Sequence, residues 1–99
     1  MEAISHMRDG IILINTARGD LVDDDAVIGG VLSGKIGAIG LDVCRGEPNF
    51  DQRYLDLDRT VLLPHMGSGT VETRRAMGQK VIDNIEASFA GRPLPDEVI

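Results

Sequence analysis

Residues 11–43 read IILINTARGDLVDDDAVIGGVLSGKIGAIGLDV, and this stretch decides the fold class. It opens at residues 11–14 on an apolar run without alternation, which is typical of a strand covered on both faces. A second apolar run, at residues 36–43, is rich in β-branched and small residues and predicts another strand. Residues 24–33 between them predict a short helix. Strand, helix and strand over about 33 residues have the length of a right-handed βαβ unit in a parallel sheet.

The predicted helix carries recognisable signals at both ends. Asp23 is placed to act as its N-cap, and the two aspartates that follow suit the positive end of the helix dipole. Gly34 predicts the end of the helix. Inside it, Gly29 and Gly30 each cost about 1 kcal/mol relative to alanine. Three adjacent carboxylates in a first helical turn do not converge on one point, so no metal site is predicted there.

The chain downstream predicts one more strand and one more helix. Residues 49–59 are rich in charged side chains and predict a surface excursion, and the apolar run at 61–63, closed by Pro64, predicts a third strand. From Thr70 the apolar residues recur at intervals of three and four, which predicts a helix of about 20 residues that Gly91 ends. We expect a stripe on this helix to pack in a core: Met77, Val81, Ile82, Ile85 and Phe89.

Three strands with two or three helices predict an α/β fold, a partial Rossmann-like, doubly wound parallel sheet. The 99 residues are 42% hydrophobic and 26% charged, as in an ordinary globular segment, and 3% aromatic, so the core must be aliphatic. A net charge of −6, with lysines and arginines spread along the chain, argues against nucleic acid and anionic membranes as partners. With the single Cys44, no leader and no long apolar span, a reducing cytoplasm is the expected location.

Polar residues follow the carboxyl end of each predicted strand, at 15–18, 42–47 and 65–68. In a parallel sheet these ends line one crevice, which is where ligands bind. An arginine there can grip a carboxylate in bidentate fashion and polarise the adjacent carbonyl. A histidine can supply a proton to the alkoxide that forms as hydride arrives, and a neighbouring carboxylate fixes its tautomer. Such a set suits the reduction of a 2-oxo acid, with hydride from a cofactor.

Three segments at these positions carry a resemblance to one family. They read ILINTARG (12–19), GLDVCRGEP (40–48) and LLPHMGSGT (62–70). In order and spacing they resemble three consecutive signatures of the D-isomer-specific 2-hydroxyacid dehydrogenases, and the likeness runs from about Met7 to Val98. The segment GSGTVETRRAMG (67–78) looks closest to the glyoxylate and hydroxypyruvate reductase branch.

The resemblance implies roles for individual residues. The substrate-gripping arginine of the family falls on Arg18, its carboxylate partner on Glu47 and its acid/base histidine on His65. The cofactor that it implies is NAD or NADP, and it implies no metal. Contacts with the nicotinamide side of the cofactor are implied for Thr16, Ala17, Arg18, Asp42, His65, Gly67 and Ser68.

Each of these residues also has a simpler interpretation. His65 could be an ordinary loop residue, Arg18 a solvated charge and Glu47 a turn residue. Asp42 could merely end its strand. Because the three segments match together, these interpretations stand or fall together. Cys44 lies near the predicted crevice, but a free cysteine at a strand end is usually a small buried hydrophobe, so we assign it no role.

The dinucleotide-phosphate loop is not found in the sequence. Neither Gly29-Gly30 nor Gly67-Ser68-Gly69 has the spacing Gly-x-Gly-x-x-Gly after a strand. We therefore expect residues 1–99 to be the C-terminal part of a dinucleotide-binding domain that lacks this loop and the substrate domain.

Two functions remain open at this point. In the first, a complete parent enzyme transfers hydride between NAD(P)H and a small 2-oxo or 2-hydroxy acid such as glyoxylate or hydroxypyruvate. In the second, the chain is a non-catalytic truncated remnant that acts through self-association or docking to another polypeptide. For the 99 residues alone we expect no catalysis, and we expect a homo-oligomer, because half a sheet leaves apolar surface open.

Overall fold

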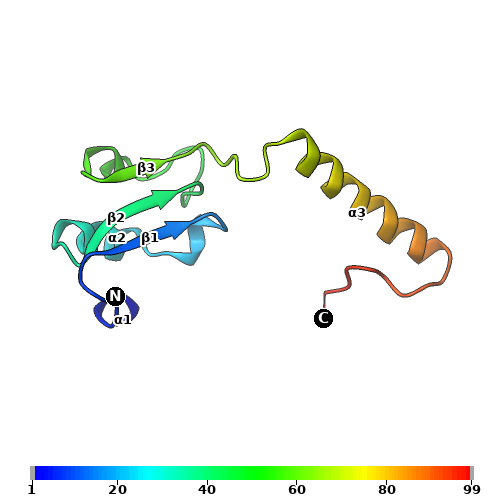
Figure 1. Cartoon of the computed structure of the whole chain (residues 1–99), viewed down its shortest axis with the longest axis horizontal. Coiled ribbons are helices and arrows are strands. Elements are labelled where there is room, and N and C mark those ends of the chain that lie inside the picture. The colour runs from blue at the N-terminus through cyan, green and yellow to red at the C-terminus, as the bar shows by residue number, and fades with distance from the viewer. Residues whose placement is uncertain (1, 99) are drawn as a thin grey trace. The chain divides into compact units, whose positions relative to one another are not determined.

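The computed structural model describes residues 2–98, and the chain forms two compact units, Met1–Gly67 and Ser68–Ile99. The first unit contains a parallel three-stranded sheet in the order β1, β2, β3, with bounds Ile11–Asn15, Ile36–Leu41 and Thr60–Leu62 (Figure 1). Its helices in chain order are α1 (Glu2–Ser5), the 3-10 helix η1 (Gly19–Leu21), α2 (Asp24–Leu32) and the 3-10 helix η2 (Gln52–Asp56). The predicted α/β, partial Rossmann-like class is confirmed.

Helix α2 begins at the residue that the sequence indicates and ends within one residue of the predicted end. The Asp23 carboxylate accepts a hydrogen bond from the Ala26 N–H at 2.8 Å, which caps the first turn. Gly34, just past the C-cap Ser33, has a φ of +78°, the left-handed conformation that glycine adopts without a Cβ penalty. The helix ends at Leu32, one residue before the predicted end.

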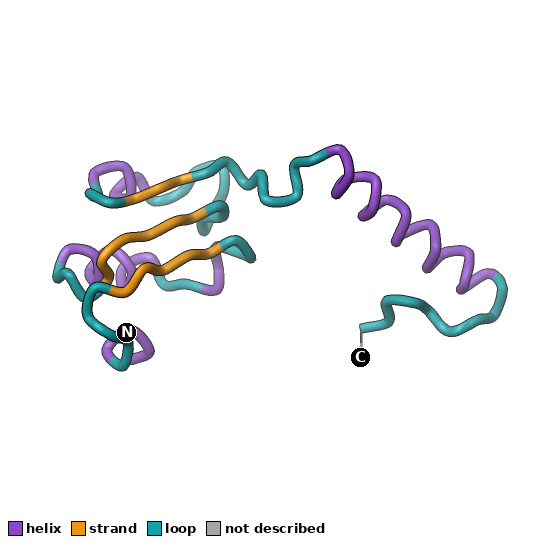
Figure 2. The backbone as a smooth tube through the Cα atoms, in the orientation of Figure 1, coloured by secondary structure: helices purple, strands orange, loops and turns teal. Residues whose placement is uncertain are grey.

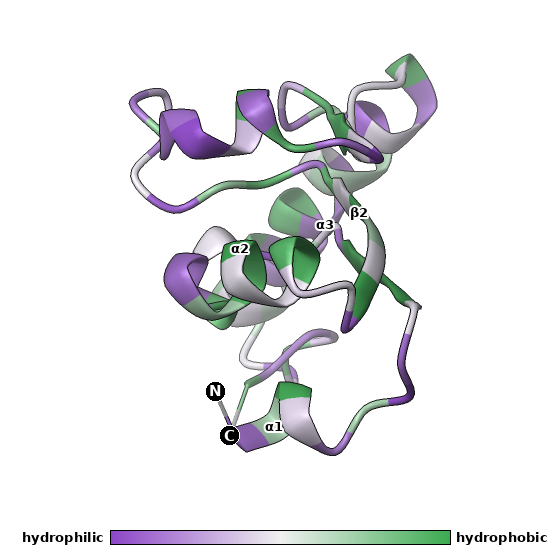
Figure 3. Cartoon of the chain, turned by 90° about the vertical axis from the view of Figure 1, so that its left-hand side faces the viewer, coloured by the Kyte–Doolittle hydropathy of each residue, from purple (hydrophilic) through white to green (hydrophobic). Residues whose placement is uncertain are grey.

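The core of the first unit lies between α2 and one face of the sheet. Figure 3 shows the apolar residues of α2 and β2 in green. Tyr54, on η2, belongs to this core: it is 1% exposed, and its hydroxyl donates to the Asp24 carboxylate at 2.8 Å. The prediction of a surface excursion at residues 49–59 is therefore wrong at Tyr54, because one aromatic side chain inside a charged segment anchors it. The rest of the core cluster is Val27, Ile28, Val31, Ile36, Ile39 and Leu41.

The opposite face of the sheet is open. Ile12 and Ile14 on β1 are 65% and 71% exposed, and Val61 on β3 is 59% exposed. The facing residues of β2 are the small Ala38 and Gly40, so a hollow of about 670 Å³ runs between the outer strands. No helix among the described residues of the first unit packs on this face.

The strand bounds differ slightly from the predicted ones. β2 ends at Leu41 instead of residue 43, so Asp42 lies in the loop that follows, where its side chain bonds to the loop after β3. β3 spans residues 60–62 instead of 61–63, and the Leu63 N–H still donates to the Leu41 carbonyl. Figure 2 shows the three strands side by side and the loops that leave their ends.

The second unit is a single helix followed by a tail. α3 (Val71–Phe89) is capped by Thr70, whose hydroxyl accepts from the Thr73 N–H at 3.2 Å. The carboxylate of Asp96 in the tail bonds to two side chains of the helix. Within this unit the predicted stripe is not buried: Phe89 is 90% exposed and the other members are about half exposed. Within residues 2–98, no helix is both long and apolar enough to cross a membrane.

Candidate active site

A buried asparagine shapes the loop after β1. Asn15 is 7% exposed, and its side-chain amide donates to the Arg18 carbonyl at 2.8 Å. Its carbonyl oxygen accepts from the Ala17 N–H at 3.1 Å, so the side chain spans the turn from both sides. The turn ends at Arg18, whose guanidinium stays exposed. Asn15 was not among the predicted site residues, although an asparagine at the end of an apolar strand is a signal for such a turn.

Glu47 makes two short hydrogen bonds in the loop after β2. One carboxylate oxygen accepts from the Cys44 N–H at 2.6 Å. The other accepts from Nδ1 of His65, on the loop after β3, at 2.8 Å. The Cys44 amide first, and the His65 hydrogen bond second, hold the pKa of the Glu47 carboxyl below its usual range. Glu47 therefore stays a carboxylate beside the imidazole at neutral pH.

The loop after β3 leaves the sheet in an unusual conformation. His65 has a φ of +53°, in the left-handed region that residues with a Cβ rarely adopt. The next two amides, of Met66 and Gly67, donate to the two carboxylate oxygens of Asp42 at 2.9 and 2.7 Å. Asp42 is 4% exposed. The loops after β2 and β3 are thus joined at two places.

The loops after β1 and β2 touch each other directly. Gly19 lies so close to the next loop that an added Cβ would stand 2.2 Å from the carbonyl carbon of Cys44 and 2.3 Å from the nitrogen of Arg45. The Arg45 guanidinium reaches back to donate to the carbonyls of Val22, at 2.8 Å, and Asp20, at 3.3 Å. Only glycine fits at position 19 with this backbone.

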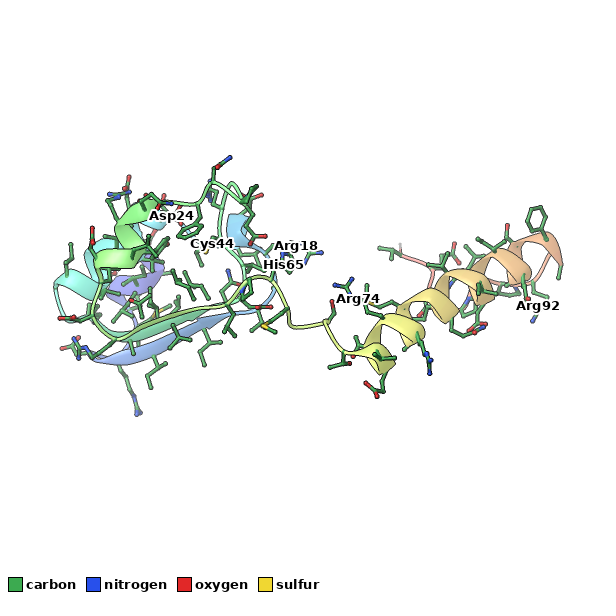
Figure 4. The ribbon with its side chains drawn as sticks, turned by 90° about the horizontal axis from the view of Figure 1, so that it is seen from above. Arg18, Asp24, Cys44, His65, Arg74 and Arg92 are labelled. Atoms are coloured by element: carbon green, nitrogen blue, oxygen red, sulfur yellow. The ribbon has the colours of Figure 1, made fainter. Side chains whose placement is uncertain are left out.

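The three predicted catalytic residues line one cavity of about 130 Å³. Arg18 enters it from the loop after β1, Glu47 from the loop after β2 and His65 from the loop after β3. Figure 4 shows Arg18 and His65 together, with Cys44 beside them. The structure therefore confirms that these three side chains lie together at the strand ends. Their chemical roles stay predictions.

Of the residues predicted to contact a cofactor, Thr16 and Asp42 lie on the open sheet face, and Gly67 and Ser68 do not line it. Thr16 and Asp42 line the open hollow on the exposed sheet face, whose floor is apolar. A hydroxyl and a carboxylate beside an apolar floor suit a flat ring that carries an amide, so this part fits the nicotinamide half of NAD or NADP. Gly67 meets Asp42 through its amide, and Ser68 belongs to the second unit. Within residues 2–98, no group of three or more potential ligand side chains could hold a metal ion.

Comparisons with known proteins agree with this arrangement. Residues 1–67 match the family profile described as D-isomer specific 2-hydroxyacid dehydrogenase, NAD binding domain. Hydroxyphenylpyruvate reductase from Plectranthus scutellarioides and glyoxylate/hydroxypyruvate reductase A from Arabidopsis thaliana are each 44% identical over 88 residues, which is 89% of this chain and 28% of each relative. The chain therefore spans little more than a quarter of the length of these relatives.

Solved structures give the same result. A 2-hydroxyacid dehydrogenase from Ketogulonicigenium vulgare is 49% identical, with a TM-score of 0.76 over 89% of this chain and 28% of that one. A D-isomer specific 2-hydroxyacid dehydrogenase from Xanthobacter autotrophicus, in complex with NADPH and MES, is 31% identical, with a TM-score of 0.85 over 99% of this chain and 40% of that one. The chain belongs to the D-isomer specific 2-hydroxyacid dehydrogenase family.

Proposed function

We propose that this chain is the C-terminal part of the dinucleotide-binding domain of an oxidoreductase. The complete enzyme would transfer hydride between NAD(P)H and a small 2-oxo or 2-hydroxy acid such as glyoxylate or hydroxypyruvate. The observation that carries the proposal is the single cavity that Arg18, Glu47 and His65 line. The names of the two curated relatives, both reductases of 2-oxo acids, support the same reaction class.

Each of the three side chains has a task in that reaction. The exposed guanidinium of Arg18 binds the carboxylate of the acid and draws electron density from the neighbouring carbonyl. Nδ1 of His65 is engaged by Glu47 at 2.8 Å, so Nε2 is the nitrogen left to give a proton to the alkoxide oxygen. The Glu47 carboxylate orients the ring through this hydrogen bond.

A bound nicotinamide cofactor would supply the hydride. Thr16 and Asp42, in the hollow of the sheet face, are the side chains that would hold its ring end, with Ala17 and Gly67 beside them. The chain has no Gly-x-Gly-x-x-Gly segment for the phosphates.

A chimaera tests the proposal. Residues of this chain replace the matching segment of glyoxylate/hydroxypyruvate reductase A from Arabidopsis thaliana, and the oxidation of NADH or NADPH with glyoxylate is measured. We expect turnover that falls about 100- to 10,000-fold in His65→Ala, the range that general acid catalysis contributes. His6→Ala, which changes the other histidine of the chain, is the matched control and should leave turnover unchanged. A chimaera that works equally well with His65→Ala would refute the proposed role.

The same proposal predicts that the 99 residues alone do not oxidise NADH or NADPH with a 2-oxo acid, because they hold no phosphate-binding loop. Turnover by the pure chain that disappears in His65→Ala would contradict this expectation. This assay of NADH or NADPH oxidation therefore distinguishes a chain that is catalytic by itself from one that is only part of a catalyst.

One observation favours the second candidate function, self-association of the chain. The open sheet face presents Ile12, Ile14, Val61 and Leu63, and parallel sheets are normally covered on both faces. We expect sedimentation at micromolar concentration to show a dimer or larger oligomer, in which a second copy of the chain buries these side chains. We expect Ile14→Glu to weaken this association. A compact monomer under those conditions would rule it out.

A further inference from the structure

Asp42 is the one charged side chain among the buried residues of the described chain. A buried carboxylate is costly unless hydrogen bonds or an opposite charge compensate it. No cation pairs with Asp42 among the described ion pairs. The Met66 and Gly67 amides compensate it instead, at 2.9 and 2.7 Å, one to each oxygen. Hydrogen bonds from amides to a carboxylate are stronger than neutral ones, so this contact is firm.

The contact holds a strained segment. His65 directly precedes the two amides, and its φ of +53° is unfavourable for a residue with a Cβ by about 1–2 kcal/mol. Such a conformation persists only where its surroundings fix it. Gly67 shows how close the fit is, because an added Cβ there would stand 2.9 Å from a carboxylate oxygen of Asp42.

We propose that Asp42 is a positioning residue whose carboxylate clamps the amides of Met66 and Gly67 and thereby holds the imidazole of His65 against Glu47. This role differs from the cofactor contact that the family resemblance implies for Asp42. Its catalytic meaning rests on the proposed function, whereas the clamp itself is a property of the folded chain and is tested without turnover.

The titration of Glu47 separates a clamp from a mere nearby charge. The Cys44 amide and then the His65 contact lower the pKa of Glu47, whereas the negative charge of Asp42 raises it and is the weakest of the causes. If Asp42 acts only as a charge, its removal lowers the pKa of Glu47 further. If Asp42 holds His65 in place, its removal releases the imidazole and the pKa of Glu47 rises. The other ionisable groups that line the same cavity are Arg18, Asp20 and Cys44.

The experiment follows the carboxyl carbon of Glu47 by NMR across a pH titration of the full 99-residue chain. Asp42→Asn keeps the shape but turns an amide toward a backbone N–H, and Gly67→Ala pushes the loop off the carboxylate without a change of charge. We expect the pKa of Glu47 to rise by about half a pH unit or more in both variants. Ile36→Val is the control for stability alone, since it leaves a small cavity in the core at the end of β2 opposite to Asp42, and it should leave the titration unchanged.

A fall, or no change, of the pKa of Glu47 in Asp42→Asn overturns the proposal. If Asp42→Asn does not fold, Gly67→Ala decides alone, and an unchanged titration there overturns it. A rise in Ile36→Val as large as that in the other two variants overturns it as well. A chimaera that fails to reduce glyoxylate counts against the proposed function and leaves the titration result standing.

Discussion

The two adjacent glycines of α2 should respond differently to alanine. Gly29 is exposed, and an added Cβ would meet no atom within 4 Å. Gly29→Ala therefore gains helix propensity alone, about 0.5–1 kcal/mol of unfolding free energy. Gly30 is buried, and its added Cβ would stand 2.7 Å from Cδ1 of Ile36, a side chain with 0% exposure. Overpacking of this kind costs about 1–3 kcal/mol, so Gly30→Ala should be neutral to destabilising by about 2 kcal/mol.

Urea denaturation followed by far-ultraviolet circular dichroism measures the difference. A small domain loses about 1 kcal/mol of stability per molar urea, so the midpoint of Gly29→Ala should rise by about 0.5–1 M. The midpoint of Gly30→Ala should stay or fall by as much as about 2 M. The wild-type chain and the double variant with both substitutions are measured in the same way for comparison. A Gly30→Ala midpoint that rises as far as that of Gly29→Ala would refute the assignment of the two helix faces.

Three further predictions concern single side chains. Tyr54→Phe should lower the unfolding free energy by about 1–2 kcal/mol in the same assay, because it removes a buried hydrogen bond to a carboxylate; an unchanged midpoint would contradict this. The hydrogen bond from Lys35 lowers the pKa of Asp9, so the stability that this pair contributes is present above the ordinary pKa of about 3.9 and is lost as the pH falls through the lower folded value. Lys35→Gln should therefore weaken the fall in unfolding free energy between neutral and acid pH, and an unchanged fall would count against this cause. Burial first, and then the charge of Glu47, raise the pKa of the Cys44 thiol. Iodoacetamide at pH 8 should therefore alkylate Cys44 more slowly than it alkylates a cysteine peptide, and Glu47→Gln should speed the alkylation of Cys44. Mass spectrometry gives these rates, and an equal rate in the wild-type chain and in Glu47→Gln would refute the role of the Glu47 charge.

Local signals made most of the fold predictable. The apolar runs at 11–14 and 36–43, the cap at Asp23 and the stop at Gly34 each depend on a few neighbouring residues, and the structure places a strand or a helix end at each. Tyr54 was missed because its burial depends on α2, which precedes it by more than twenty residues. Periodicity predicts the stripe of α3 as a packing surface, but it cannot say what lies against it.

The candidate site was predictable to the level of which residues meet. Parallel strand ends share one edge, so Arg18, Glu47 and His65 could be grouped from the sequence, and they line one cavity. The supports of the site could not be read in the same way. Asp42 meets the amides of a loop more than twenty residues away, and no side-chain pattern marks a backbone amide as a partner.

The close approach at Gly19 has a genetic consequence. An added Cβ would strike main-chain atoms of Cys44 and Arg45, which every residue type possesses. A second substitution at either of those two positions therefore cannot act as an intragenic suppressor of Gly19→Ala. A screen for revertants should return glycine at position 19, or insertions and deletions that reroute one of the two loops.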